Sequence, residues 1–259
     1  MNITFIGSGN VATHLALALH SRGHIIRQIW SRKMDHAVLL ASRVLAEPVD
    51  DIHRISPNTD IVIIAVPDDA LFDIAIDLEH TSALVLHTSG STTIDVLRST
   101  SAHYGVIWSP QSFVRDMALD YEQLPFCIEG NGVESEERIA KFIGTLSPHI
   151  YHTSLTQRQY LHLAAVLENN FANGLHAMAQ AICKEHDMPF EILHPIITTT
   201  AKRALYADVR YSLTGPAVRH DTHTLRTHQQ LLTDKPQYLD VYKAMTLLLQ
   251  SVMNDWNRS

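Results

Sequence analysis

The 259-residue sequence contains only two cysteines, Cys127 and Cys183, which are too few for a disulfide framework or a zinc site built from paired cysteines. No apolar run approaches the ~20 residues that a membrane-spanning helix requires. The chain opens on a strand pattern and shows no signal peptide. We therefore expect a cytoplasmic protein.

Cationic side chains are also scarce, since 20 Lys and Arg stand against 27 Asp and Glu, a formal charge of −7 with neutral histidines. An acidic chain is poorly suited to nucleic acid or to an anionic membrane, and we expect neither as a partner. Although there are 17 histidines, no H-E-x-x-H or comparable spacing occurs, and we expect no metal. The length favours two domains.

The first stretch of the chain combines an apolar strand, a glycine turn and a helical pattern, with G-x-G-x-x-A at the joint. Gly7 permits a sharp turn, and Gly9 lets a pyrophosphate approach the backbone. The N-terminus of the following helix provides free N–H groups for the phosphates. We therefore predict cofactor contacts from Gly7, Ser8, Gly9, Asn10 and Val11. The alternative is a tight turn that binds nothing.

The end of the second strand pattern, over residues 24–30, discriminates between cofactors. An acidic residue there is typical of NAD binding, whereas an arginine suits the 2′-phosphate of NADP. The residues present are Ser31 and Arg32. We therefore expect NADP in preference to NAD, although Arg32 on a solvated helix start is the alternative.

Further strands and helices alternate up to residue 152, which predicts an α/β fold with a Rossmann-like doubly wound parallel sheet. Ligands of such sheets lie outside the carboxyl ends of the strands. We therefore predict cofactor contacts at or just after the carboxyl ends of the strands at 60–66 and 83–86, and a substrate contact after the strand at 103–108. The cofactor residues are Ala65, Val66, Pro67, Thr88 and Ser89, and the substrate residue is Gln111.

Beyond residue 153 the pattern becomes helical, with stretches near 156–187, 189–206, 217–233 and 237–256. We predict a dinucleotide-binding domain over residues 1–153 and an all-α C-terminal domain, for substrate and dimerisation, over residues 154–259. At ~100° per residue, His162, Asn169, Asn173 and His176 share one face of the first helix, with Asn170 beside them. This polar face fits either a ligand cleft or a helix–helix interface.

The stretch Leu213–Asp221 (LTGPAVRHD) breaks one helix and starts another. Arg219 is able to hold a substrate carboxylate in a bidentate pair. Alternatively, Arg219 and Asp221 pair with other helices, with Asp221 stabilised near a helix N-terminus.

Taken together, these motifs resemble a bacterial family that joins a Rossmann-like NADP-binding domain to a helical domain of unknown function. The Gly-Pro-x-x-Arg-x-Asp stretch is the most specific of them. The sequence is more distantly similar to pyrroline-5-carboxylate reductase, ketopantoate reductase and deazaflavin-dependent NADP oxidoreductases, within the 6-phosphogluconate dehydrogenase-like superfamily. The resemblance implies an NADP oxidoreductase scaffold that dimerises through its helical domain. The catalytic lysine of the related hydroxyacid dehydrogenases is missing, because Val166 stands four residues before Asn170.

We therefore expect an NADP(H)-dependent oxidoreductase that transfers a hydride to or from a small carbonyl- or imine-containing metabolite bearing a carboxylate. His87 or His162 is the expected proton donor, because the ordinary pKa of histidine is ~6.5. Asn170 completes the catalytic residues, and Asn173 and Arg219 join Gln111 in substrate binding. The alternative functions are a non-catalytic NADP sensor with a helical dimerisation domain and a Rossmann domain without nucleotide.

Overall fold

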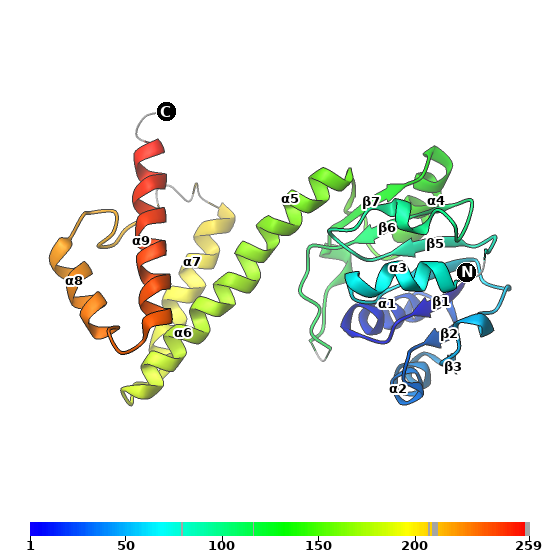
Figure 1. The fold of residues 1–259 in the computed structure, drawn as a ribbon, viewed down its shortest axis with the longest axis horizontal. Coiled ribbons are helices and arrows are strands. Elements are labelled where there is room, and N and C mark those ends of the chain that lie inside the picture. The colour runs from blue at the N-terminus through cyan, green and yellow to red at the C-terminus, as the bar shows by residue number, and fades with distance from the viewer. Residues whose placement is uncertain (79, 116, 207, 209–211, 257–259) are drawn as a thin grey trace. The chain divides into compact units, whose positions relative to one another are not determined.

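The computed structural model describes residues 1–78, 80–115, 117–206, 208 and 212–256. The chain divides into two compact units, Met1–Phe171 and Ala172–Ser259. Figure 1 colours the chain from the N-terminal unit in blue and green to the C-terminal helices in yellow and red.

The first unit is built on one sheet, in which the described residues form eight strands in the order β3-β2-β1-β4-β5-β6-β7-β8. Neighbouring strands are parallel except β6 and β7, which pair antiparallel. The order from β3 to β6 is that of a dinucleotide-binding sheet, and the predicted Rossmann-like fold is confirmed. The strands are β1 (Asn2–Ile6), β2 (Ile25–Trp30), β3 (Glu47–Val49), β4 (Ile61–Ile64), β5 (Leu84–His87), β6 (Tyr104–Trp108), β7 (Phe126–Gly130) and β8 (Ile150–His152).

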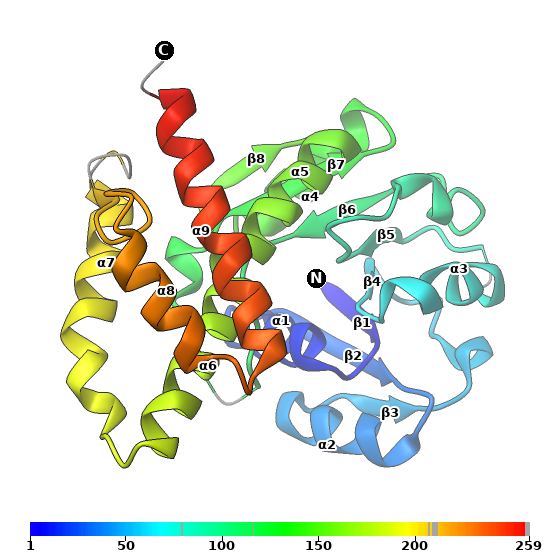
Figure 2. The same ribbon diagram turned by 60° about the vertical axis from the view of Figure 1, so that its left-hand side comes forward.

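Helices cover both faces of this sheet (Figure 2). The helices α1 (Asn10–Ser21), α2 (Met34–Val44) and α4 (Val133–Ile143) pack on one face, and α3 (Asp68–Asp77) packs on the other with the 3₁₀ turns η1 (Ile52–Arg54) and η2 (Ile94–Leu97). A third 3₁₀ turn, η3 (Tyr121–Gln123), precedes β7. The unit closes with α5 (Leu155–Ala165) and a π-helical segment, η4 (Val166–Phe171).

The buried strand β4 shows why the sequence specifies two covered faces. Successive strand side chains point to opposite sides. Ile61 and Ile63 belong to the core cluster beneath α1 and α2, whereas Val62 and Ile64 belong to the cluster beneath α3. A continuous apolar run therefore fills both cores, as expected for a central parallel strand.

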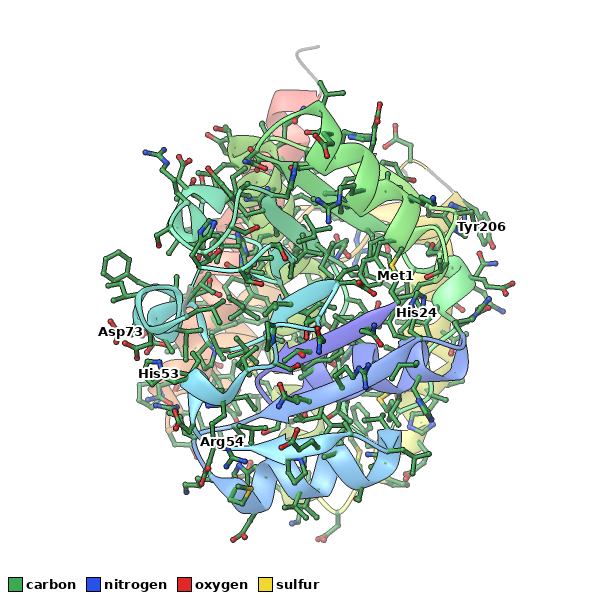
Figure 3. The ribbon with its side chains drawn as sticks, turned by 90° about the vertical axis from the view of Figure 1, so that its right-hand side faces the viewer. Met1, His24, His53, Arg54, Asp73 and Tyr206 are labelled. Atoms are coloured by element: carbon green, nitrogen blue, oxygen red, sulfur yellow. The ribbon has the colours of Figure 1, made fainter. Side chains whose placement is uncertain are left out.

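The β3 edge of the sheet is protected by polar side chains. Arg54, labelled in Figure 3, forms an ion pair with Glu47 at 3.7 Å. The Gln28 side-chain amide donates to the Glu47 carboxylate at 3.0 Å and to the Arg54 carbonyl at 3.1 Å. Charged and bonded side chains at an edge strand discourage pairing with another chain.

The regular elements described in the second unit are all helical, as predicted for an all-α domain. Its elements are α6 (Ala172–Glu185), η5 (Phe190–Leu193), α7 (His194–Tyr206), α8 (Thr222–Leu231) and α9 (Pro236–Trp256). Among the helices that the structure describes, none combines the length and apolar character needed to cross a membrane.

Two local expectations are wrong. The helix expected over 156–187 changes to π-helical bonding at Val166–Phe171. The helix expected from residue 217 begins at Thr222, because His220 adopts a left-handed φ of 53° and Asp221 caps the helix instead of entering it.

Candidate functional site

The glycine turn after β1 is held tightly between two neighbouring strands. Gly7 has a φ of +121°, and its N–H donates to the Trp30 carbonyl at 2.9 Å. A Cβ at Gly7 would lie 2.2 Å from the Ala65 carbonyl oxygen and 3.5 Å from Val66 Cγ1. Only glycine fits this position without strain. The turn therefore sits against the carboxyl end of β4, where Ala65, Val66 and Pro67 are predicted to meet the cofactor.

Gly9 faces open space, in contrast to Gly7. A Cβ there would meet no atom within 4 Å. Gly9 is the N-cap residue of α1 and offers no side-chain oxygen, and the first helical turn, which begins with Asn10 and Val11, contains no acidic residue. The N–H groups and the positive end of the helix dipole are thus directed at a surface where an anion can bind.

The predicted adenosine end of the site lies beside the same turn. Ser8 Oγ donates to Ser31 Oγ at 3.0 Å, which links the glycine turn to the end of β2. Ser31 lines a surface cavity with Arg32, Lys33 and His36, of which the last three are exposed. Three side chains able to carry positive charge around a fixed hydroxyl are suited to a phosphate.

The turn after β5 is organised by His87. Its ring is fully buried, and Nδ1 accepts a hydrogen bond from the Ser89 N–H at 3.1 Å. Burial, reinforced by the positive charge of Arg158, lowers the pKa of His87 to about 3. His87 is therefore neutral with its proton on Nε2, a buried atom with no partner among the described residues. These observations favour a structural role for His87, and His162 stays the other predicted proton donor.

The environment of His87 makes the free energy of unfolding depend on pH. Its pKa is about 3 in the folded protein and ordinarily 6.5, so protons bind more tightly to the unfolded state. The stabilisation is present above the ordinary pKa and is lost as the pH falls towards 3. When the pH is lowered from 7 to 5, we expect the free energy of unfolding of the wild type to fall by about 2 kcal/mol more than that of His87→Gln. Urea unfolding of both proteins at each pH measures this difference. Equal losses in the two proteins would contradict the lowered pKa of His87.

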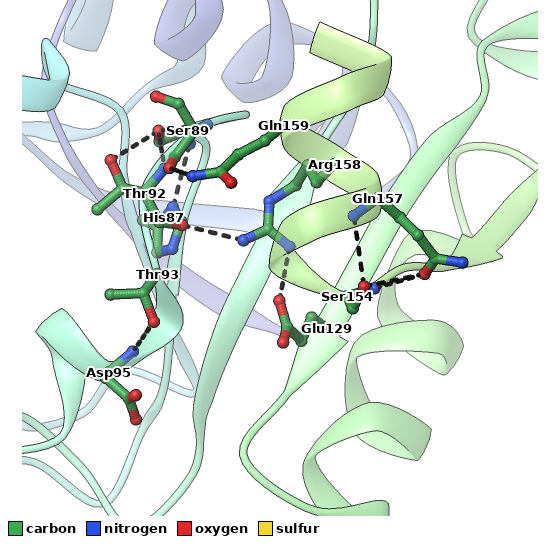
Figure 4. A network of polar contacts seen from close by, with 11 residues as sticks. His87, Ser89, Thr92, Thr93, Asp95, Glu129, Ser154, Gln157, Arg158 and Gln159 are labelled. Atoms are coloured by element: carbon green, nitrogen blue, oxygen red, sulfur yellow. Dashed lines mark hydrogen bonds and ion pairs between the residues drawn. The ribbon is translucent and has the colours of Figure 1, made fainter.

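A buried arginine fixes α5 to this turn (Figure 4). Arg158 is fully buried, and its Nη1 donates to Glu129 Oε2 at 2.6 Å while Nη2 donates to the Thr92 carbonyl at 2.9 Å. The adjacent Gln159 side chain donates to the Ser91 carbonyl at 3.1 Å. Sequence reasoning missed Arg158, because an arginine in the first turns of a polar helix is usually solvated. These bonds hold in place the helix that carries His162, one turn further on.

Two neighbouring cavities of the first unit collect several predicted residues. The larger, about 240 Å³, is lined by Trp108, Ser109, Pro110, Gln111 and Ser112 after β6, and by His162, Ala165, Val166, Asn169 and Asn170. The smaller, about 70 Å³, is lined by Val11, Leu15, Thr88, Ile107, Phe113 and Phe126, together with Trp108, Ser109 and Gln111. Trp108, Ser109 and Gln111 line both cavities. The predicted cofactor contacts Val11 and Thr88 therefore lie next to the cavity that His162 lines.

The π-helical segment shapes the larger cavity. Bonding from i to i+5 widens the helix and changes the direction of the residues beyond it, and such segments are frequent at functional sites. Val166, Asn169 and Asn170 all line the cavity from this segment. The ~100° per residue assumed in the sequence analysis therefore gives correct side-chain directions only up to Ala165, where the π-helical segment begins.

Trp108 and Ser109 are cavity residues that sequence reasoning did not select. The Trp108 ring lies 5.7 Å from the His162 ring in an edge-on arrangement, at an interplanar angle of 76°. Ser109 Oγ is buried and has no hydrogen-bond partner among the described residues. Both residues stand at the carboxyl end of a strand, close to Gln111, and this position could have identified them from the sequence.

The two remaining predicted substrate residues, Asn173 and Arg219, belong to the second unit and stay predictions. Arg219 is exposed in the turn before α8. Asp221 Oδ1 accepts from the Thr224 N–H at 3.1 Å, which makes it the N-cap of α8 and lowers the pKa of its carboxyl. Among the described residues there is no cluster of metal-ligating side chains.

Two matching family models divide the chain. Residues 2–90 match "NADP oxidoreductase coenzyme F420-dependent", and residues 124–248 match "Domain of unknown function (DUF2520)". The Bacteroides fragilis protein BF3122, assigned as an NADP oxidoreductase, is 32% identical and superposes with a TM-score of 0.91 over 96% of this chain and 98% of its own. The chain belongs to this NADP oxidoreductase family. NADP, the cofactor expected from Ser31 and Arg32, is the cofactor of this family.

More distant structures share the fold with this member of the NADP oxidoreductase family. A 1-pyrroline-5-carboxylate reductase from Streptococcus pyogenes is 14% identical, with a TM-score of 0.63 over 97% of this chain and 98% of that chain. An imine reductase from Myxococcus stipitatus in complex with NADP⁺ is 15% identical, with a TM-score of 0.64 over 98% and 95%. No curated protein matches the sequence.

Proposed function

We propose that the protein is an NADP(H)-dependent oxidoreductase that transfers a hydride to or from a carbonyl or imine carbon of a small, carboxylate-bearing metabolite. The observation that carries the proposal is the pair of contiguous cavities at the carboxyl ends of β5 and β6. Val11 and Thr88 line one cavity, and His162 lines the other. Predicted cofactor contacts and a titratable side chain thus lie together at the carboxyl ends of neighbouring strands.

The residues present fit the cofactor. Gly7 to Val11, at the open N-terminus of α1, would hold the pyrophosphate, and Ser31 with Arg32 would hold the 2′-phosphate. Ala65, Val66, Pro67, Thr88 and Ser89 follow β4 and β5, where the nicotinamide of such sheets lies. When bound, NADPH supplies the hydride.

The protein's own groups then handle the substrate. His162 holds a proton for the substrate oxygen or nitrogen as the adjacent carbon is reduced, and it accepts that proton in the reverse direction. Its contact with Trp108 fixes the position of the ring. Asn170 and Gln111 line the same cavity and orient the polar groups of the substrate. Arg219 is the proposed partner of the substrate carboxylate.

Imines are the first substrates to test, because the imine reductase and the pyrroline-5-carboxylate reductase share this fold. A panel of cyclic imino acids and 2-oxo acids is assayed for NADPH oxidation by absorbance. We expect turnover with at least one member and a loss of 10²-fold or more in kcat for His162→Ala. The exposed His186, in the turn after α6, provides the matched control, His186→Ala.

Two outcomes would oppose the proposal. Full turnover by His162→Ala would remove His162 from the mechanism. NADPH binding without oxidation by any member of the panel would favour the non-catalytic NADP sensor.

We also propose that the protein forms a homodimer through its helical unit. Four hydrophobic side chains are buried among the described residues of this unit, namely Cys183, Ala217, Leu225 and Leu232. Large apolar side chains remain exposed in this unit, including Met188, Ile192, Ile196, Leu205, Leu231 and Leu247. Exposed apolar surface of this extent is typical of an interface. We expect sedimentation equilibrium to give a molar mass twice that of the 29.1 kDa chain. A monomer at micromolar concentration would contradict the proposed dimer.

A further inference from the structure

The connection between β6 and β7 lies along α1, the helix that follows the glycine turn. His14 Nε2 donates to the Val114 carbonyl at 2.8 Å, and the Tyr121 hydroxyl donates to the His14 carbonyl at 2.8 Å. Arg22, the C-cap residue of α1, pairs with Glu122 at 3.0 Å. A segment 100 or more residues away in the sequence is thereby fixed beside the predicted cofactor site.

These contacts bring Arg115 to the glycine turn. Its Nη2 lies 3.4 Å from the Ser8 carbonyl oxygen, a long contact to a neutral acceptor that contributes little binding. Arg115 is exposed, and the described residues offer its guanidinium no ion pair. Its positive charge and most of its donors thus remain available to a ligand at this turn.

The cavity beside the turn has the character of an anion site. It measures about 230 Å³ and is lined by Ser8, Thr13, His36, Leu39, Leu40, Arg43 and Arg115. Three of these side chains are able to carry positive charge, and none of the described lining residues is acidic. His36 also lines the neighbouring cavity of Ser31 and Arg32, so the two cationic surfaces are contiguous.

We propose that Arg115 binds the pyrophosphate of the nucleotide cofactor, as a ligand supplied from outside the first 90 residues. The inference rests on the proposed function, since it requires a bound dinucleotide. Arg115 contacts Ser8 within the turn itself, whereas Arg32 follows Ser31 at the end of β2. The guanidinium of Arg115 is therefore assigned to the phosphates next to the N-terminus of α1, and that of Arg32 to the 2′-phosphate. A charge-assisted bidentate contact is well suited to the pyrophosphate.

The two assignments separate in a binding experiment with NADPH and NADH. Both nucleotides contain the pyrophosphate, but only NADPH carries the 2′-phosphate. We expect Arg115→Ala to weaken both by the same factor of about tenfold or more, and Arg115→Lys to lose less. Arg32→Ala should weaken NADPH alone. Calorimetric titration of the full chain gives the dissociation constants without knowledge of the substrate.

Arg22→Ala is the matched control, because it releases the same segment from α1 at the Glu122 contact without removing Arg115. It should bind both nucleotides as the wild type does. Unchanged affinities in Arg115→Ala, or a loss confined to NADPH, would overturn the proposal. Wild-type protein that binds neither nucleotide would instead refute the proposed function, so the two failures are distinguishable.

Discussion

Replacement of Gly9 by aspartate is expected to weaken NADPH binding by at least about 100-fold while the protein stays folded. A Cβ at Gly9 meets no atom within 4 Å, so the new side chain fits the free protein. Its carboxylate, however, occupies the N-terminus of α1 where the pyrophosphate binds, and it competes for the same N–H groups. Aspartate is also a favourable N-cap residue, so the free energy of unfolding should equal or exceed that of the wild type.

Gly9→Asn separates the charge from the size in this experiment, because asparagine has the same shape and also caps helices. We expect Gly9→Asn to bind NADPH less well than the wild type but better than Gly9→Asp. Nucleotide titration and urea unfolding of the three proteins provide both quantities. Unimpaired NADPH binding by Gly9→Asp would show that the open turn is not the phosphate site.

Removal of the Arg158 side chain is expected to lower the free energy of unfolding by about 3 kcal/mol or more. Arg158 is fully buried and bonds both Glu129 and the Thr92 carbonyl. Arg158→Ala leaves the Glu129 carboxylate, only 24% exposed, without its partner, and it leaves a void where the long side chain packed. Breaking one side of a buried pair is costly because the remaining charge stays poorly solvated.

Arg98→Ala is the control for Arg158→Ala. Arg98 pairs with Asp95 at 2.9 Å, but both side chains are more than half exposed, and such solvated pairs contribute little to stability. Urea unfolding should therefore show a large loss for Arg158→Ala and a small one for Arg98→Ala. Equal losses would contradict the view that Arg158 anchors α5.

The first part of the fold was predictable because its signals are local. The strand, the glycine turn and the helix occupy consecutive residues, and the positive φ of Gly7 reflects the tight turn that its motif requires. The apolar run of β4 likewise indicates a strand covered on both faces. The antiparallel pairing of β6 with β7 was not predictable, because it depends on contacts between distant segments.

The candidate site was predictable by position but not by side-chain direction. His87 was selected because it stands at a strand end, yet it is the last residue of β5. Leu84 and Leu86 point to one face of the sheet, and Val85 and His87 point to the other. That alternation directs His87 into the core beneath η2, where burial keeps it neutral. The roles of Arg158 and Arg115 depend on partners from distant segments, Glu129 and Ser8, which no local pattern reveals.

The most direct test is a titration of the purified 259-residue protein with NADPH and NADH, with Arg32→Ala alongside. The central claim is that the turn from Gly7 to Val11, together with Ser31 and Arg32, forms an NADP site. It predicts micromolar NADPH binding, weaker NADH binding, and a fall of NADPH affinity to the NADH level in the mutant. A folded protein that binds neither nucleotide would contradict the account.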